Sequence, residues 1–165
     1  MLSAFSAGIV GLGDRLGRTD RSIVERLIDD EGRLVTSATP MALCPESFFD
    51  AEDAGVITWA DAHDGDHRYL LALHLDDSTE PLAGSLDLDG EYLVHEWRSG
   101  TSNLATSIEV ELTPRDWALY VVCPTHGPEG ARWAVVGDTR RYATRGGSGR
   151  DASPSDATRW LEIDG

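Results

Sequence analysis

One group of residues that could do chemistry lies in the turn between positions 61 and 67. Its members are Asp61, His63, Asp64, Asp66 and His67. Zinc accepts such ligands, but two histidines four apart in a turn lack the helical geometry of H-E-x-x-H, and a calcium loop needs more oxygen ligands and a terminal Glu. Asp64-Gly65 between two strand-like runs is instead typical of a β-hairpin. We therefore expect a hairpin turn here and no metal site.

Tryptophans form the second group, because an exposed indole ring can stack on a sugar. Trp117 lies inside the most apolar run of the chain and is predicted to be buried in the core. Trp59, Trp97 and Trp133 are the candidates for sugar stacking, with packing inside the fold as the alternative for each of them.

The machinery of hydrolysis is not specified by the sequence. A glycosidase holds two carboxylates about 5 to 10 Å apart in a pocket, whereas the acidic residues of this chain are scattered over turns. Gly8, Gly11 and Gly13 do not form G-x-G-x-x-G, and the chain has no P-loop lysine. Cys44 and Cys123 lie far apart without a C-x-x-C pattern, which favours buried free thiols. We expect no catalytic residue, no metal and no cofactor in this chain.

Strands must position these side chains, and three of them are predicted within residues 91–124. The runs are Glu91–Trp97, Thr106–Leu112 and Asp116–Cys123, separated by turns at Ser99-Gly100 and Pro114. The middle run alternates apolar and polar residues, which predicts one buried and one exposed face. The third run is apolar throughout and is predicted to be a central strand covered on both faces. We expect these three runs to form a β-meander.

The whole chain is predicted to be mainly β, an antiparallel β-sandwich of Greek-key type with a short N-terminal strand-helix segment. The other predicted strands are Gly55–Ala62, Arg68–Leu75, Gly84–Leu88, Ala131–Val136, Arg141–Thr144 and Arg159–Ile163. A helix is expected over Arg21–Asp29, capped by Thr19 or Asp20, and Gly32 ends the unit. The expected organisation is an N-terminal segment (1–35), a connector (36–53) and the β-domain (54–165), with a Gly/Ser loop at 145–157.

Charge is the strongest compositional signal. The chain has 29 acidic residues against 14 basic ones, a net charge of -15, and all of the basic residues are Arg. Such a surface repels nucleic acid and anionic membranes. An acidic, lysine-free composition resembles that of proteins from salt-in halophiles, with an ordinary acidic cytosolic protein as the alternative. The apolar N-terminal stretch has no basic region before it and is too short to span a bilayer, so we expect a soluble, cytoplasmic protein.

Three motifs resemble one known family. Tyr92–Gly100 with the strand that ends at Pro124 is similar to the C-terminal β-domain of the α-galactosidase and raffinose synthase group of glycoside hydrolases (family 36 and relatives). Ala7–Gly17, followed by Asp20, the short helix and Glu31–Val35, resembles that group's passage from the last barrel strand into the β-domain, with Ile9 where the family usually has Pro. Residues 133–142 resemble a late turn of the family, in which Tyr142 stands where His is common.

The resemblance implies a non-catalytic part of such an enzyme. The family's catalytic carboxylates lie upstream of the matched segment, so residues 1–35 would be a remnant of the last strand and helix of a (β/α)8 barrel, and the chain alone would be inactive. Asp14 would lie near the barrel mouth and hold a loop, with contact to substrate as the lesser alternative. The alternatives for function are a carbohydrate-binding or accessory module, and a subunit of a split enzyme whose partner is a separately encoded barrel.

The N-terminal segment raises a physical question of its own. A barrel strand at Ala7–Leu12 has no parallel neighbour in this sequence, so its apolar side chains must fold back onto the sandwich, stay exposed, or pair with another polypeptide. An exposed strand edge favours self-association through residues 1–35. On that reading, deletion of this segment yields a more soluble monomer.

Overall fold

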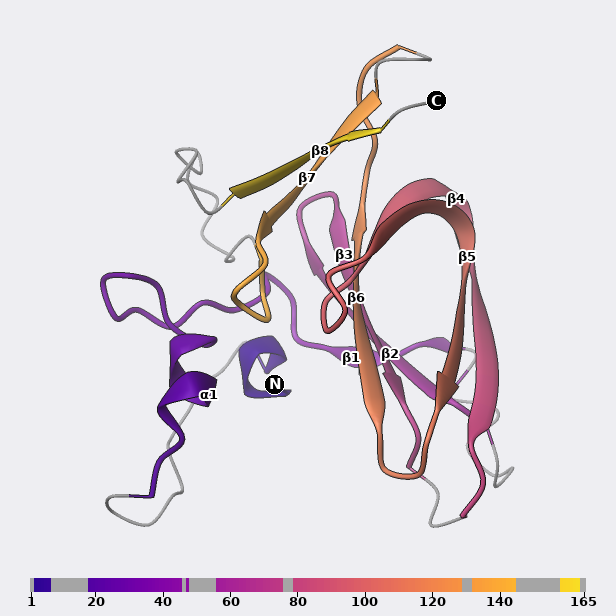
Figure 1. Cartoon of the computed structure of the whole chain (residues 1–165), viewed down its shortest axis with the longest axis horizontal. Coiled ribbons are helices and arrows are strands. Elements are labelled where there is room, and N and C mark those ends of the chain that lie inside the picture. The colour runs from indigo at the N-terminus through magenta and orange to yellow at the C-terminus, as the bar shows by residue number, and fades with distance from the viewer. Residues whose placement is uncertain are drawn as a thin grey trace.

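The computed structural model describes residues 2–6, 18–45, 47, 56–75, 79–128, 132–144 and 158–163, the last stretch as backbone only. This part of the chain is mainly β (Figure 1). Its elements in chain order are η1 (Leu2–Phe5), α1 (Arg21–Glu25), β1 (Ala42–Leu43), β2 (Thr58–Asp64), β3 (His67–Leu73), β4 (Leu82–Glu96), β5 (Ser102–Leu112), β6 (Trp117–Cys123), β7 (Arg132–Asp138) and β8 (Thr158–Ile163). Neither described helix is long and apolar enough to cross a membrane.

Within the described residues, six strands form one antiparallel sheet in the order β1-β2-β3-β6-β4-β5, and β7 pairs with β8 in a separate hairpin. The predicted central strand is confirmed, because β6 lies between β3 and β4. The predicted meander is wrong in its order: β6 returns beside β4 and not beside β5. Strands that follow one another in the sequence pair often but not always. Here β6 follows β5 in the sequence but forms its backbone hydrogen bonds with β3 and β4.

β6 explains why both faces of the sheet are covered. Leu119, Val121 and Cys123 join a core cluster on one face, together with Tyr69 and Leu71 of β3. Ala118, Tyr120 and Val122 alternate with them and join a second cluster on the other face, together with Leu70 and Trp59. The strand therefore has no solvent-facing side, as its unbroken apolar sequence predicts.

The face of the sheet that carries Ala118, Tyr120 and Val122 is covered by a bent part of the same sheet. β4 and β5 run together through a pronounced arch (Figure 1), with a register irregularity between Asp87 and Tyr92. Leu86, Ile108 and Leu112 on the far part of this ribbon are buried in the cluster that holds Trp59. The segments 84–88 and 91–97, predicted as two strands, are thus one long bent strand, which serves both layers of a sandwich-like fold.

The first face is covered by the N-terminal residues and by the segment that follows β7. Ala4, Phe5 and Leu27 are buried there, with Val136 and Tyr142. The backbone ties this layer together: Met41 N donates to Phe5 O at 2.8 Å and Tyr142 N donates to Arg26 O at 3.3 Å. Ala4, Phe5 and Leu27 are therefore part of the core of the domain. The predicted strand at Ala7–Leu12 lies outside the described residues.

Local details follow the sequence with two differences. Asp20, one of the two expected caps, accepts from Ser22 N at 2.9 Å, whereas Gly32, with φ +79, lies in the turn after the helix and not at its end. However, α1 ends at Glu25, because the chain then turns back to form a bridge between Ile28 and Leu34. Residues 141–144 are not the predicted strand; they close a compact loop in which Asp138 N donates to Thr144 O at 2.8 Å. Cys44 and Cys123 are buried and form no disulfide, as predicted.

Candidate functional site

The predicted site residues lie in different places. Asp14 lies outside the described residues. Trp59 is 3% exposed and packs in the second core cluster, so it offers no open ring face to a ligand. Trp133 is 40% exposed and lies beside His126, with ring centroids 4.8 Å apart. Trp97 is half-buried, and it is the one of these candidates that lines a hollow.

The His/Asp turn is a hairpin turn between β2 and β3, as expected, with Gly65 at φ +61. Asp61 accepts from Arg68 Nε at 2.9 Å. The buried His67 donates from Nε2 to the carbonyl oxygen of Val135, which ties the hairpin to β7. Across the described residues, no three His, Cys, Asp or Glu side chains are grouped so that they could hold a metal ion.

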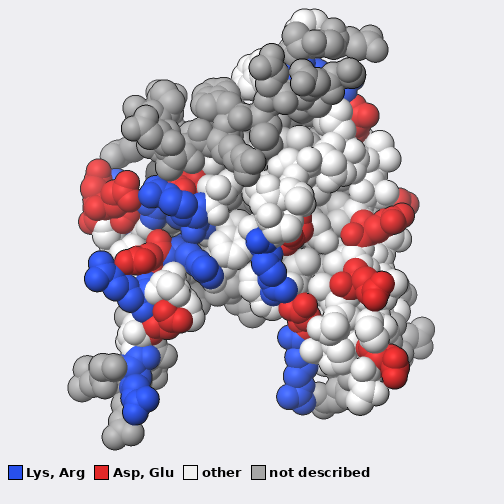
Figure 2. All heavy atoms as spheres, viewed as in Figure 1, with Lys and Arg blue, Asp and Glu red and all other residues white. Residues whose placement is uncertain are grey.

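A hollow of about 480 Å³ lies between the α1 side of the molecule and the sheet. Four segments far apart in the sequence meet there: the end of α1, the turn after β4, the start of β6 and the loop after β7. The described residues that line it are Arg26, Trp97, Arg98, Trp117, Thr139 and Arg140, and we call them the Arg–Trp hollow. Figure 2 shows this face of the molecule, where Arg side chains gather on both sides of the notch between α1 and the sheet.

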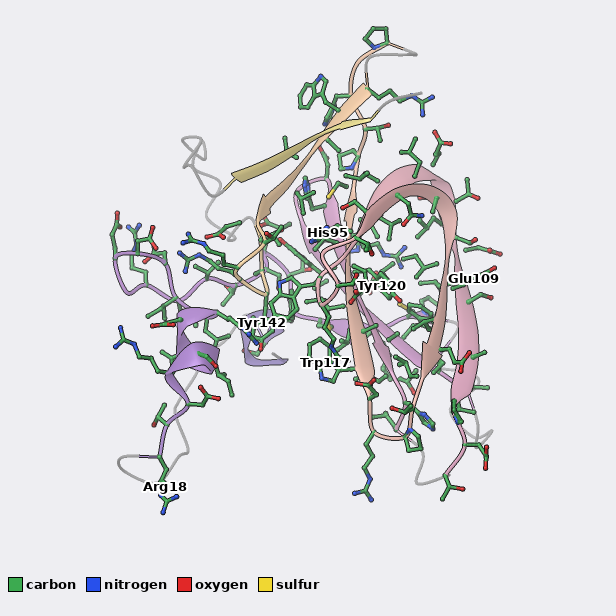
Figure 3. The ribbon with its side chains drawn as sticks, in the orientation of Figure 1. Arg18, His95, Glu109, Trp117, Tyr120 and Tyr142 are labelled. Carbon is green, nitrogen blue, oxygen red and sulfur yellow. The ribbon has the colours of Figure 1, made fainter. Side chains whose placement is uncertain are left out.

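Two aromatic rings line the Arg–Trp hollow, those of Trp97 and Trp117, and the ring of Tyr142 packs against Trp97. The centroids of Trp97 and Trp117 are 6.4 Å apart, and those of Trp97 and Tyr142 are 4.7 Å apart. Figure 3 shows Trp117 on β6 and Tyr142 in the segment that follows β7. Trp97 is fixed in place because its Nε1 donates to Arg141 O at 2.7 Å. The Trp97 ring is therefore in contact both with the sheet, through Trp117, and with the segment after β7, through Arg141 and Tyr142.

Guanidinium groups lie over these rings. The Cζ atom of Arg26 is 5.3 Å from the Trp97 centroid and 6.0 Å from that of Tyr142, and Arg98 Cζ is 4.3 Å from the Trp117 centroid. Such cation–π contacts stabilise by about 0.5–1 kcal/mol each at exposed sites. They also hold the cations at the surface of the hollow, where a ligand can reach them.

Two carboxylates neutralise part of this charge from outside the lining. Asp138 accepts from both Arg140 and Arg141, at 2.8 to 2.9 Å. Burial raises the pKa of the Asp138 carboxyl, but these hydrogen bonds outweigh it and hold the pKa below its usual range. For Asp116 burial likewise raises the pKa, and bonds from Trp117 N and Arg98 lower it by more. Both carboxylates are therefore ionised at neutral pH.

Arg26 differs from the other guanidinium groups of the hollow. Its side chain contacts the rings of Trp97 and Tyr142 and makes a long 3.5 Å bond to the Tyr142 hydroxyl. No carboxylate of the described residues forms an ion pair with it. Hydrogen bonds from Ser22 lower the pKa of the Asp20 carboxyl, and the charge of Arg26 lowers it further, so Arg26 is partly compensated by Asp20 without a direct ion pair.

The described lining of the Arg–Trp hollow consists of Arg, Trp and Thr side chains, which can bind a ligand through charge, hydrogen bonds and ring contacts. None of the described lining residues is a carboxylate, a cysteine or a histidine, so the lining offers neither an acid/base pair nor an activated nucleophile. The sequence indicates Trp97 as a candidate, but it predicts Trp117 to be buried in the core and gives no reason to select Arg26, Arg98 or Arg140. The Trp97-Arg98 pair and the Arg140-Arg141 pair are the visible signals, but nothing in the sequence indicates that these pairs meet α1.

No protein-family profile matches the chain, and no curated protein is significantly similar to it. The likeness to the α-galactosidase group therefore rests on the three motifs in the sequence, and it remains a prediction.

Proposed function

We propose that this chain is a non-catalytic β-domain that binds carbohydrate through the Arg–Trp hollow, as an accessory part of an α-galactosidase-like glycoside hydrolase. The observation that carries the proposal is the adjacent pair Trp97 and Trp117 in a hollow whose described lining contains no carboxylate. Aromatic rings supply the flat apolar surface on which the C–H face of a sugar packs. The proposed association with an α-galactosidase-like enzyme is supported by the three sequence motifs alone.

The binding half of the proposal is tested by affinity electrophoresis of the purified chain in gels that contain galactans or other plant and microbial polysaccharides. We expect at least one of them to retard the chain, and Trp117→Ala to abolish the retardation. Trp133→Ala is the matched control, because Trp133 is exposed but does not line the hollow. Equal loss in both variants, or no retardation by any polysaccharide, would overturn the assignment of the hollow.

The non-catalytic half is tested with a chromogenic α-galactoside in molar salt. We expect no hydrolysis above the uncatalysed rate by the chain alone. Turnover that persists after repeated purification would show that the chain is itself an enzyme. A search of the neighbouring genes for the missing barrel would distinguish an accessory domain from a subunit of a split enzyme.

A further inference from the structure

Within the proposed function, the charges of the Arg–Trp hollow indicate which class of sugar it takes. A neutral sugar stacks on an open ring face, but Arg26 and Arg98 already lie over Trp97 and Trp117. A neutral ligand that stacks on these rings would have to displace the guanidinium groups. An anionic ligand can keep both cations in place and bind to them.

The donors for an anion are present on three sides of the hollow. Arg26 makes no direct ion pair with a carboxylate of the described residues, and its planar guanidinium presents N–H donors in a fork that matches a carboxylate. Arg98 uses Nη1 to bind Asp116, and Arg140 uses Nε and Nη2 to bind Asp138. These bonds engage only part of the five donors that each guanidinium carries.

The overall charge of the chain does not prevent such binding. A net charge of -15 repels anions at long range, but this repulsion is screened beyond about 8–10 Å at ordinary ionic strength and beyond about 3 Å in molar salt. A hydrogen bond between a ligand and a guanidinium group inside the hollow is shorter than these screening lengths, so salt weakens it less than it weakens the long-range repulsion. The local excess of Arg therefore decides what binds once a ligand has entered.

We propose that the Arg–Trp hollow binds an acidic saccharide, with a uronate carboxylate held by Arg26 and the sugar ring lying against the surface that the guanidinium groups of Arg26 and Arg98 form together with Trp97 and Trp117. Thr139 lies in the lining with a hydroxyl group that suits a sugar hydroxyl. The carboxylate distinguishes this ligand from a neutral sugar of the same ring geometry, and the ring contact distinguishes it from a simple anion.

The test is calorimetric titration of the full chain, at the lowest salt concentration at which it is folded, with two ligands of equal length. One is an oligogalacturonate and the other is the corresponding neutral galacto-oligosaccharide, which differs at C6. We expect the acidic ligand to bind about tenfold or more tightly, the factor that one charge-assisted hydrogen bond supplies. Acetate and sulfate serve as ring-free anions and should bind far more weakly than either oligosaccharide.

Variants assign the effect to Arg26. Arg26→Gln should remove the preference for the acidic ligand, and Arg26→Lys should restore it only in part, because an ammonium group lacks the planar fork. Arg21→Gln is the matched control: it lies on the same helix, removes the same charge, and binds only Glu25 at the surface. The circular dichroism spectrum should be the same for all three variants.

The outcomes separate this inference from the proposed function. Equal affinity for the acidic and neutral oligosaccharides would overturn the acidic specificity and leave carbohydrate binding intact. Affinity for sulfate or acetate equal to that for oligogalacturonate would identify a simple anion site and overturn both. Binding of neither oligosaccharide would also overturn both, and an equal effect of Arg21→Gln and Arg26→Gln would show that net charge, and not this site, is responsible.

Discussion

At Gly84 the arch of β4 comes so close to the residue before β2 that no side chain fits. A Cβ atom built at this position would lie 2.8 Å from both Cβ and Cγ1 of Ile57, which are not the far end of a flexible chain. We expect Gly84→Ala to lower the free energy of unfolding by roughly 1–3 kcal/mol, because the ribbon must lift from the second core cluster.

Chemical denaturation measures this loss, and Gly90→Ala is its control. Gly90 lies on the same strand, and a Cβ there would meet only the Tyr92 ring at an ordinary 3.5 Å. The control should change stability by less than about 0.5 kcal/mol. Equal losses of unfolding free energy in the two variants would mean that the close contact between Gly84 and Ile57 does not affect stability.

Asp138 binds two Arg side chains of the loop after β7, next to the hollow. Asp138→Asn removes the charge that binds Arg140 and Arg141, and we expect a loss of about 1–3 kcal/mol at neutral pH. Because the pKa of Asp138 is lowered in the fold, its contribution is fully present above the unfolded-state pKa of about 3.9 and is lost as the pH falls through the folded value.

Unfolding curves from pH 7 down to pH 3 test this dependence. The advantage of the wild type over Asp138→Asn should be constant down to about pH 5 and shrink below about pH 4. Asp30→Asn should have little effect at any pH, since Asp30 binds the same Arg141 but is 83% exposed. A difference that grows toward acid would contradict the assigned direction of the pKa shift.

Among the elements, η1 shows how far the N-terminal segment belongs to the domain. Phe5 is 1% exposed, and its ring centroid is 5.1 Å from that of Tyr69 on β3. We expect Phe5→Ala to cost about 3–5 kcal/mol and deletion of residues 1–35 to unfold the chain, and not to release the more soluble monomer that the sequence suggested.

Thermal unfolding and size-exclusion chromatography measure both changes. Ile23→Ala is the control, since Ile23 on α1 is 44% exposed and should contribute little. A folded, monomeric deletion product would show instead that the segment is dispensable, as a barrel remnant would be.

The sequence predicts where individual helices and strands lie better than it predicts which of them pair with one another. β6 could be identified as central because its apolar run needs cover on both faces, and the cap of α1 could be assigned to Thr19 or Asp20 from their side chains. The placement of β6 beside β4 depends on contacts between distant segments, which no local pattern encodes. The hollow was missed for the same reason: Arg26 and Trp97 are 71 positions apart in the chain and meet only when both sides of the molecule are assembled.

For the whole molecule, charge predicts how salt should act. The net charge of -15 without lysine should weaken the fold in dilute buffer, and the Debye length falls from about 10 Å at 0.1 M to about 3 Å at 1 M. We expect the unfolding midpoint to rise over this range. The ion pairs that salt also weakens are mostly exposed, such as Arg21–Glu25, and contribute little.

Potassium chloride and sodium chloride should act alike at equal ionic strength, since the effect is screening. A midpoint that stays flat between 0.1 M and 1 M would contradict adaptation to a saline interior.

β6 carries one more consequence for the molecule as a whole. Its alternate side chains form part of the core on each face, so the loss of this strand from the sheet would open both cores at once. Neither layer can then melt while the other persists, and the domain should behave as a single cooperative unit. A ligand held between α1 and the sheet would accordingly protect every amide of the central strands, including those far from the hollow, by the same free energy.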